Sequence, residues 1–496
     1  MFAQTADDVT RADDELIVVT APRIAGAVTT DIPPEFELDV AGIASYGASS
    51  IADLMAAIAT QTGTGRGRGG GAPEVLLNGR RVSGFTEIRD LPPEAIKKVE
   101  VFAEDVALQY GYSADQRVVN FILKDDFSAT TAELEYGQPT AGGRSEIEAQ
   151  ATYLKLTKAG RLNLSAQYDR DASILESERN IIQTGGDIGR FRTLLPTNDA
   201  QQLNATLSRA LSKTVSATLN LRFDNSVNDA LFGVPDAVIA NPSITNFSPL
   251  SRVSRARTFH AGVTVDGNID RWQWTLTANY DDTTSRSLTD RNVTNPLLLG
   301  LLAPDSARSQ IVTTNGIYSV SGPLVQLPAG ALMLSVRAGF DEKSFSSESV
   351  RALVNSISSL QRGEANGRIS IDIPLADRGR SVASALGDLS VNANFGYRNL
   401  TDFGSLIAFG YGLTWSPLKG LTVLASAAGE DNAPTPQQLG DPTIVTPNVT
   451  VFDFVRGQTA IVTLISGGNA ALRAANTRDV KVGFSFTPPS KKELNF

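Results

Sequence analysis

The strongest constraint on the fold is a two-residue alternation of polar and apolar side chains, which begins near residue 127 and recurs along the rest of the chain. In "SEIEAQATYLKL", residues 145–156, Glu146 and Glu148 alternate with Ile147 and Ala149. Roughly 14 to 16 such segments of about 9 to 13 residues follow one another, separated by polar or Pro- and Gly-containing loops. Because successive side chains of a strand point to opposite faces, the pattern predicts many antiparallel strands with one polar face each.

Four features favour a transmembrane β-barrel over a soluble sandwich. The segments are long and uniform, and their polar faces carry Glu, Gln, Asn, Asp and Arg, as a wet lumen requires. Tight connections such as "KAGR" alternate with long ones such as residues 172–199. No run of about 18 apolar residues exists, so no transmembrane helix is expected. Aromatic residues stand near segment ends, where membrane interfaces lie, at Tyr153, Tyr168, Phe223, Tyr280, Phe340 and Tyr397.

Residues 36–126 predict a small α+β domain ahead of the barrel residues, 127–496. Ser49 or Ser50 can cap a helix whose apolar residues recur at helical spacing from Ile51. "PEVLLNGRRVSG" predicts two strands joined by a turn at Asn78 and Gly79, the second strand covering residues 81–83. "LPPEAIKKVEVFAED" predicts a short helix begun by its prolines and a strand over residues 99–102, and "QRVVNFILK" predicts a further strand.

Residues 1–35 contain too few large apolar residues to build a core, so we expect a mobile arm. One strip differs, "ELIVVTAP" at residues 15–22, where a β-prone run is stopped by Pro22. An apolar strip of this kind is an aggregation hazard if nothing covers it. A partner that pairs with the strip as an added edge strand would explain its presence.

Composition excludes several kinds of site. The net charge of −9 disfavours nucleic-acid binding, which needs a basic face. The chain has no Cys and one His, His260, so a His/Cys metal site and a Cys nucleophile are excluded. A Ser–His–Asp triad would depend on His260 alone, which we expect to be an ordinary strand residue beside Phe259. Acidic pairs such as Asp281 and Asp282 are expected to be lumen or loop charges. We therefore expect no catalytic residue, no metal and no cofactor.

The glycine-rich run "GTGRGRGGG", residues 63–71, holds Arg66 and Arg68 just before a predicted strand. A phosphate-binding P-loop is excluded, because no Lys-Ser/Thr follows these glycines. A nucleic-acid arm would be longer and lie in a basic tail. Two interpretations stay open: the arginines face an anionic substrate, or they pair with lumen carboxylates such as Glu146.

The order of these pieces resembles the TonB-dependent outer-membrane receptors, and the resemblance covers the whole chain. "DELIVVTAP" is similar to the family's TonB box, and "PEVLLNGRRVSGFTEIRDLPPEAIKKVEVFAEDVALQYGYSADQRVVNFILK" resembles the plug core, from its NG turn to its closing strand. Two segments depart from the family pattern: Glu104 and Asp105 replace an Arg-Gly-Pro turn, and residues 115–117 replace the usual glycines. The plug–barrel contacts at those positions cannot be carried over from the family.

The resemblance implies sites as well as a fold. The TonB-binding residues would be Glu15, Leu16, Ile17, Val18, Val19 and Thr20. Residues that would meet substrate at the outer face are Arg66, Arg68, Arg80 and Arg81. The function implied is active uptake of a scarce or bulky nutrient across the outer membrane of a Gram-negative bacterium, with TonB, outer-membrane lipid and an extracellular substrate as partners. The alternatives are a barrel-bound hydrolase and a passive porin-like barrel.

The strand count predicts an incomplete barrel. A plug of this size has a radius of gyration of about 12 Å, and plugged lumens go with about 22 strands. The roughly 14 to 16 segments counted here are too few for that lumen. Unpaired strand edges are not tolerated in lipid, so we expect either a truncated sequence or a second chain that supplies the remaining strands. "PPSKKELNF" at the C-terminus lacks the alternation of a final membrane strand.

Overall fold

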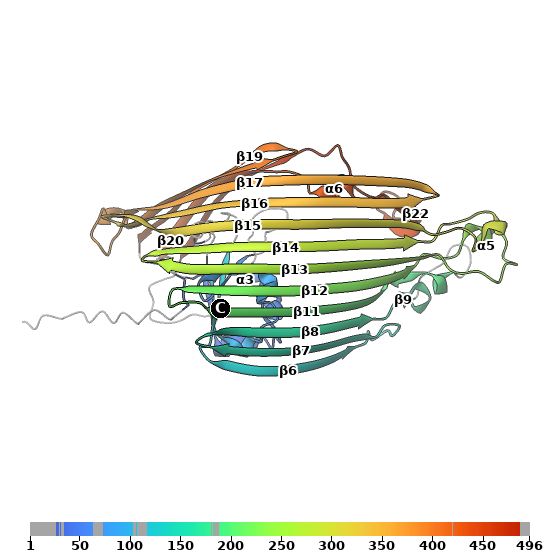
Figure 1. Ribbon diagram of the computed structural model, residues 1–496, viewed down its shortest axis with the longest axis horizontal. Helices are drawn as coiled ribbons and strands as arrows, with labels where there is room; N and C mark the ends of the chain where they lie inside the picture. The colour runs from blue at the N-terminus through green and yellow to red at the C-terminus, as the bar shows by residue number, and fades with distance from the viewer. Residues whose placement is uncertain are drawn as a thin grey trace, which may run out of the picture.

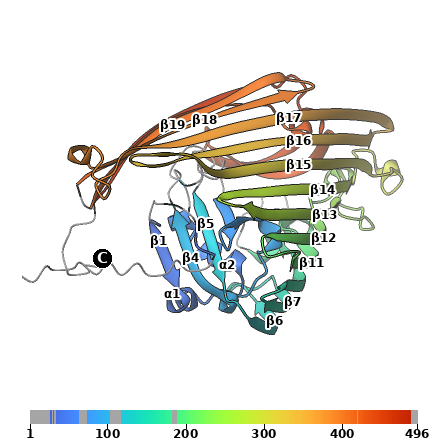
Figure 2. The ribbon, with the colours of Figure 1, turned by 60° about the vertical axis from the view of Figure 1, so that its left-hand side comes forward.

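The computed structural model describes residues 26–28, 30, 34–62, 73–102, 106, 117–179, 181, 188–418 and 420–486. The strip at residues 15–20, the arginines Arg66 and Arg68, and the C-terminal segment from residue 487 lie outside the described residues. Within them, the chain forms a small α+β domain and a large curved antiparallel sheet that wraps around one side of it (Figures 1 and 2). The first is the plug and the second is the barrel wall.

The plug is built on a five-stranded sheet in the order β1-β4-β5-β2-β3. The pair β2 and β5 is parallel, and the other pairs are antiparallel. In the described part of the plug, the helices α1 to α3 and two 3₁₀ turns connect the strands. The bounds are β1 Phe36–Asp39, α1 Val40–Ser45, α2 Ile51–Ala57, α3 Ala59–Thr62, β2 Glu74–Leu77, β3 Arg80–Arg81, η1 Phe85–Glu87, η2 Pro93–Ala95, β4 Ile96–Phe102 and β5 Val118–Leu123.

The helix predicted in this region is confirmed. It begins after Ser50, whose side chain accepts a hydrogen bond from the backbone N–H of Asp53. Ile51, Leu54 and Ile58 lie in the plug core with no exposed surface. Helical spacing therefore placed the apolar face correctly, and the cap fixes where the helix begins.

The predicted turn is also confirmed, since Asn78 and Gly79 both have positive φ, at 51° and 71°. The strand after it was predicted over residues 81–83 and is instead Arg80–Arg81. It ends early because Ser83 donates its backbone N–H and its hydroxyl to the Glu87 carboxylate, which turns the chain away from the sheet. The strand β1 and the helix α1 were not anticipated from the sequence.

Among the residues that the structure describes, the barrel wall has 14 strands, in the order β23-β20-β19-β18-β17-β16-β15-β14-β13-β12-β11-β8-β7-β6. Each strand thus pairs with its neighbour in sequence, apart from short elements inserted in the loops. The bounds are β6 Phe127–Gly137, β7 Glu146–Thr157, β8 Gly160–Asp171, β11 Thr197–Ala210, β12 Val215–Leu231, β13 Ser251–Ile269, β14 Trp272–Thr289, β15 Asp305–Leu327, β16 Gly330–Arg351, β17 Val354–Ala376, β18 Asp388–Leu400, β19 Gly404–Leu418, β20 Leu421–Asn432 and β23 Ala475–Phe486.

Several strands are longer than expected. The longest, β15 and β17, have 23 residues each, whereas a strand needs only about 9 to 11 residues to cross a bilayer. The predicted contrast between short and long connections holds for most of the sheet, with three exceptions. At the long-loop end, β16 and β17 are joined by Ala352 and Leu353, and β18 and β19 by residues 401–403; at the other end, β17 and β18 are joined by the longer segment of residues 377–387.

The outer loops carry the remaining short elements. The pair β9 and β10 belongs to the loop between β8 and β11, α5 to the loop between β12 and β13, and η5 to the loop between β14 and β15. The hairpin of β21 and β22 lies between β20 and β23, after the short helix α6. Their bounds are β9 Ile174–Leu175, η3 Glu176–Glu178, η4 Gly189–Phe191, β10 Thr193–Leu195, α5 Asp236–Ala240, η5 Pro296–Leu298, α6 Pro436–Gly440, β21 Ile444–Asp453 and β22 Gln458–Ser466; on the opposite side, η6 Ser384–Leu386 precedes β18.

The sheet does not close on itself within the described residues. β6 forms one edge and β23 the other, and each pairs with one neighbour only. Figure 2 shows the wall curving over the plug from β6 to β19 without returning to β6. The prediction of an incomplete barrel is therefore confirmed for this part of the chain.

A candidate gate between plug and barrel

One contact between plug and barrel is made by the segment that follows the β2–β3 hairpin. Glu87 lies at the end of η1, and its Oε1 accepts a hydrogen bond from Nη2 of Arg161 on β8 at 2.6 Å. The two side chains are only 4% and 6% exposed. An ion pair so well shielded from water is costly to break on one side, because the remaining charge would be left buried and unpaired.

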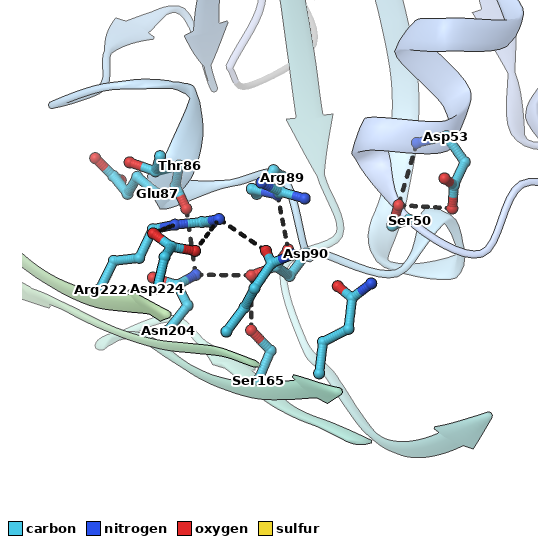
Figure 3. A network of polar contacts seen from close by, with 12 residues as sticks. Ser50, Asp53, Thr86, Glu87, Arg89, Asp90, Ser165, Asn204, Arg222 and Asp224 are labelled. Carbon is cyan, nitrogen blue, oxygen red and sulfur yellow. Dashed lines mark hydrogen bonds and ion pairs between the residues drawn. The ribbon is translucent and has the colours of Figure 1, made fainter. Parts of the chain in front are cut away.

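Asp90 makes the second polar contact in this segment (Figure 3). Its Oδ2 accepts hydrogen bonds from Ser165 Oγ on β8 at 2.6 Å and from Asn204 Nδ2 on β11 at 3.0 Å. Its neighbour Arg89 forms an ion pair with its other oxygen at 3.2 Å. One carboxylate therefore connects the plug to two adjacent barrel strands.

Backbone oxygens of the same segment add to the contact. Asn204 Nδ2 donates to the carbonyl of Thr86 at 3.2 Å, and Thr206 Oγ1 donates to the carbonyl of Glu87 at 3.3 Å. The barrel side chains involved alternate along β11, as expected for one face of a strand. Asn204 and Thr206 thus form a polar patch on the inner wall, and their side chains donate hydrogen bonds to oxygen atoms of one plug segment.

Of the arginines expected from the sequence to meet substrate, two are described, and both lie at the short-connection end. Arg80 pairs with Asp266 on β13 and also donates to Ser216 Oγ on β12 at 2.8 Å. Asp266 stands three residues before the end of its strand, close to the tight turn that leads into β14. Arg81 borders a small cavity at this end, and its neighbours there are Gln273, Thr275, Ser319, Ser321 and Ser335.

The N-terminal arm joins the plug beside Arg80. Asn120, on β5 and fully buried, donates through Nδ2 to the carbonyl of Gly26 at 2.9 Å and accepts at Oδ1 from the backbone N–H of Gly79 at 2.8 Å. Val28 is buried against Leu76 and neighbouring apolar residues. A cavity of about 340 Å³ opens at this junction. It is lined by Gly26, Ala27, Asn78, Gly79, Arg80, Asn268, Asp270, Arg271, Trp272, Gln273, Ser321, Gly322 and Met333.

The loop between β20 and β23 reaches across the outer side of the lumen. Its helix α6 packs against β16 and β17, where Ser347 Oγ donates to the carbonyl of Gly440 at 2.9 Å. Farther along, Arg192 of the β8–β11 loop donates to the carbonyl of Asn448 at 2.6 Å, and Arg192 also pairs with Glu176. Through α6 and the β21–β22 hairpin, this loop thus contacts two distant parts of the wall at the long-loop end.

Within the described residues, the single histidine of the chain has one acidic partner and belongs to no larger cluster of His, Cys, Asp or Glu. No group of three or more His, Cys, Asp or Glu side chains there could hold a metal ion. His260 Nδ1 lies 2.7 Å from Asp281 Oδ1, but its Nε2 has no hydrogen-bond partner, and the hydroxyl of Ser83 donates to Glu87 instead. A Ser–His–Asp triad is therefore not assembled at the one histidine of the chain. No helix in the described part of the chain is long and apolar enough to cross a membrane.

The sequence did not identify Glu87, Asp90, Arg161 or Asn120 as functional candidates. Each is one polar residue among many in a strand or turn of ordinary composition. Their common property is burial of a charged or amide group, which depends on which plug segment faces which strand. A signal was present only at Asn120, a lone polar residue inside the apolar run "VVNFIL".

The chain resembles known proteins in fold and not in sequence. No protein-family model matches the chain, and no curated protein matches it in sequence. Solved structures do match. The siderophore receptor PirA from Acinetobacter baumannii is similar over 92% of this chain and 68% of that chain, with 15% identity and a TM-score of 0.55.

Two further structures give the same result. The ferric enterobactin receptor PfeA from Pseudomonas aeruginosa, in complex with enterobactin, matches over 91% of this chain and 70% of its own, with 15% identity and a TM-score of 0.59. The RagAB peptide transporter matches over 92% of this chain and 66% of its own, with 10% identity and a TM-score of 0.53. At such identities the likeness concerns the fold, and the chain therefore has the plug-and-barrel fold of the TonB-dependent outer-membrane receptors.

Proposed function

We propose that this chain takes part in TonB-dependent active uptake of a scarce or bulky nutrient across the outer membrane of a Gram-negative bacterium. In this proposal residues 1–35 are the arm that TonB grips, residues 36–126 are the plug, and residues 127–496 belong to the barrel. An outer membrane has no nucleotide supply and sustains no ion gradient of its own. The energy must therefore arrive mechanically, through the arm.

The observation that carries the proposal is the polar character of the contact between plug and barrel. Glu87, Asp90 and Arg80 bind barrel side chains through ion pairs and hydrogen bonds, whereas the apolar core of the plug extends to the barrel at Leu154 and Leu156 of β7. Polar contacts of this kind can be replaced by water when the plug moves, whereas separating two apolar surfaces in water has no such compensation. The barrel can then hold the plug at rest and release it under load.

The position of the arm supports mechanical transmission. Gly26 is hydrogen-bonded to Asn120, which also holds Gly79, and the next residue, Arg80, is paired with Asp266 of the barrel. A pull on the arm would therefore load first the turn at Asn78 and Gly79, and through Arg80 the plug's contact with β13. The grip itself would be strand addition by TonB to the strip at residues 15–20.

The substrate would bind on the outer side of the plug and on the outer loops. We propose that Arg66 and Arg68 face it and favour an anionic group. Arg80 and Arg81, proposed with them from the sequence, contact barrel residues at the short-connection end, and for Arg80 we favour a role in holding the plug. Structures of similar fold include siderophore receptors and a peptide transporter, which supports a small-molecule or oligomeric nutrient without naming it.

A deletion strain tests the proposal. Its growth should fail on one limiting source among ferric siderophores, cobalamin and carbohydrates, and the same failure should appear when TonB is removed while the receptor is present. A barrel-bound hydrolase would instead release product from esters or glycosides in purified form. A passive porin would support growth without TonB, and either result would overturn the proposal.

A further inference from the structure

The barrel strands β13 and β14 carry a small polar cluster that the proposed uptake function does not use. Its centre is His260, the only histidine of the chain, on the inner face of β13. Asp281 of β14 lies directly opposite His260 in the register of the sheet, and Asp281 Oδ1 is 2.7 Å from His260 Nδ1. A carboxylate can only accept a hydrogen bond, so Nδ1 carries the hydrogen and Nε2 of the neutral ring presents a lone pair.

A second lone pair lies close to the first. Asn279, two residues before Asp281, donates a side-chain N–H to Asn315 Oδ1 at 3.2 Å, which leaves the Oδ1 of Asn279 as an acceptor. Across the described residues, His260 Nε2 and Asn279 Oδ1 are both buried and neither has a hydrogen-bond partner. A buried acceptor that is left unpaired destabilises the fold, so this pair of atoms needs a donor or a cation.

Gly262 provides the space that the two atoms border. It lies directly opposite Asn279 on β14 and two residues after His260. A Cβ at this position would lie 2.8 Å from Asn279 Oδ1 and 2.9 Å from His260 Nε2. The same Cβ would lie 3.2 Å from Cβ of Ser83, which belongs to the plug. The absence of a side chain at Gly262 therefore leaves a small cradle between wall and plug, bordered by two lone pairs.

The chemistry of this cradle favours a metal ion. An imidazole whose Nδ1–H is held by a carboxylate has the arrangement found at most metal-binding histidines. Imidazole nitrogen and amide oxygen suit divalent transition metals such as Zn²⁺, Ni²⁺ and Cu²⁺. The cation opposite His260 on β12, Arg222, is itself paired with Asp224 at 2.7 Å (Figure 3). The side chain of Asp281 is 37% exposed, which leaves a route for an ion from the lumen.

We propose that the space over Gly262 binds one divalent transition-metal ion, with His260 Nε2 and Asn279 Oδ1 as its protein ligands and water in the remaining positions. The composition of the chain excludes a site made of several His or Cys residues, but this arrangement needs one histidine only. Because Ser83 borders the cradle, a bound ion lies against the plug and stabilises its contact with the wall. The inference goes beyond the proposed uptake function and does not depend on it.

Electron paramagnetic resonance with Cu²⁺ as the probe tests the inference. The full chain is purified in neutral detergent with an affinity tag that contains no histidine. Since the chain has one His and no Cys, spin-echo modulation from a remote imidazole nitrogen can come only from His260. The wild type should show this signal at one equivalent of Cu²⁺, and His260→Gln should abolish it. Asp281→Asn should weaken binding about 10- to 100-fold, because it removes the partner that orients the ring.

Two further variants distinguish the cradle from an imidazole alone. Gly262→Ala keeps His260 but fills the space, so the affinity for Cu²⁺ should fall at least about tenfold. Gly367→Ala is the matched control and should bind Cu²⁺ as the wild type does, because a Cβ there would meet its nearest neighbour at 3.8 Å. Asn279→Leu removes the second ligand without crowding the backbone, and it should also weaken binding.

Thermal unfolding provides a second measurement. Zn²⁺ should raise the unfolding temperature of the wild type but not of His260→Gln or Gly262→Ala, because an ion that binds only the folded state stabilises it. Absence of the imidazole signal in the wild type, or equal Cu²⁺ affinity in the wild type and Gly262→Ala, would overturn the inference and leave the cradle to water. Since purified protein and a bare metal ion are used, neither result depends on transport.

Discussion

Glu87 of the plug and Arg161 of the barrel strand β8 form an ion pair of 2.6 Å from which water is almost entirely excluded. The pair connects two segments that are 74 residues apart in sequence. It is the most deeply buried charge contact between plug and barrel in the described structure, and the account above depends on contacts of this kind to hold the plug at rest.

Removing one partner of this pair should loosen the plug. Arg161→Ala leaves the Glu87 carboxylate buried without its cation, at a cost of about 3 to 5 kcal/mol. We expect greater permeability of the outer membrane to bulky antibiotics and larger conductance in planar bilayers. Arg170→Ala, at a 65% exposed position on the same strand, is the control and should change neither.

The double variant Glu87→Gln/Arg161→Met sharpens this test. This variant removes both charges and keeps most of the side-chain volume. Outer-membrane permeability and conductance should therefore return most of the way to the wild-type values. Equal leakage in the single and double variants would show that the pair's charge is not what holds the plug.

Asn120 should transmit force from the arm to the plug. Asn120→Leu keeps the volume but leaves the carbonyl of Gly26 and the N–H of Gly79 without their partner, at about 1 to 3 kcal/mol for each group. We expect energised uptake to fall while binding of substrate at the cell surface stays unchanged. Faster proteolysis of the arm near residue 26 would accompany this; unchanged uptake together with unchanged proteolysis would refute the role.

Helix α2 should lose stability in acid through Asp53. Burial alone would raise the pKa of Asp53, but hydrogen bonds from Ser49 and Ser50 outweigh it and lower that pKa below its ordinary 3.8. Because the folded-state pKa is the lower one, this stabilisation is present above pH 3.8 and is lost as the pH falls through the folded-state value. Hydrogen exchange over residues 51–57 should therefore be slower in the wild type than in Asp53→Asn above pH 3.8, and the difference should vanish in stronger acid. A difference that is independent of pH would contradict this.

The periodic parts of the fold could be predicted from the sequence, and the contacts between them could not. Alternation at Glu146 and Ile147 predicts which faces of a strand meet lumen and lipid, because that pattern is set locally. The helix from Ile51 and the turn at Asn78 also follow from local spacing and capping. Strand length exceeded expectation because pairing between β15, β16 and β17 continues toward the long loops into residues where alternation is weak.

The candidate site depends on distant parts of the chain. Glu87 meets Arg161 only because the five-stranded plug sheet presents η1 to β8, and no local pattern contains that orientation. Arg80 shows the same limit. The family resemblance placed it at the outer face, yet the hairpin points toward the short connections and brings Arg80 to Asp266. The helices, strands and turns could be predicted from local sequence patterns, whereas the residues of the site are brought together by packing between these elements.

The strip at residues 15–20 should be required for energised uptake. Ile17→Pro removes a backbone donor and blocks strand addition there, so uptake should fall to the level of a strain without TonB while surface binding persists. Thr5→Pro, in the same arm but outside the strip, is the control. Uptake at the wild-type rate in Ile17→Pro would exclude this strip as the TonB-binding segment.

The central claim, that the plug must move for import to occur, is tested most directly by fastening it to the wall. The chain has no cysteine, so Asp90→Cys/Ser165→Cys creates a single possible cross-link, between side chains whose polar atoms now lie 2.6 Å apart. The measurement is uptake of the nutrient that the deletion strain cannot use, in cells oxidised with a thiol-specific oxidant and then reduced. The account predicts normal surface binding throughout, no uptake in the oxidised state and recovery on reduction. Full uptake with the cross-link formed would contradict it.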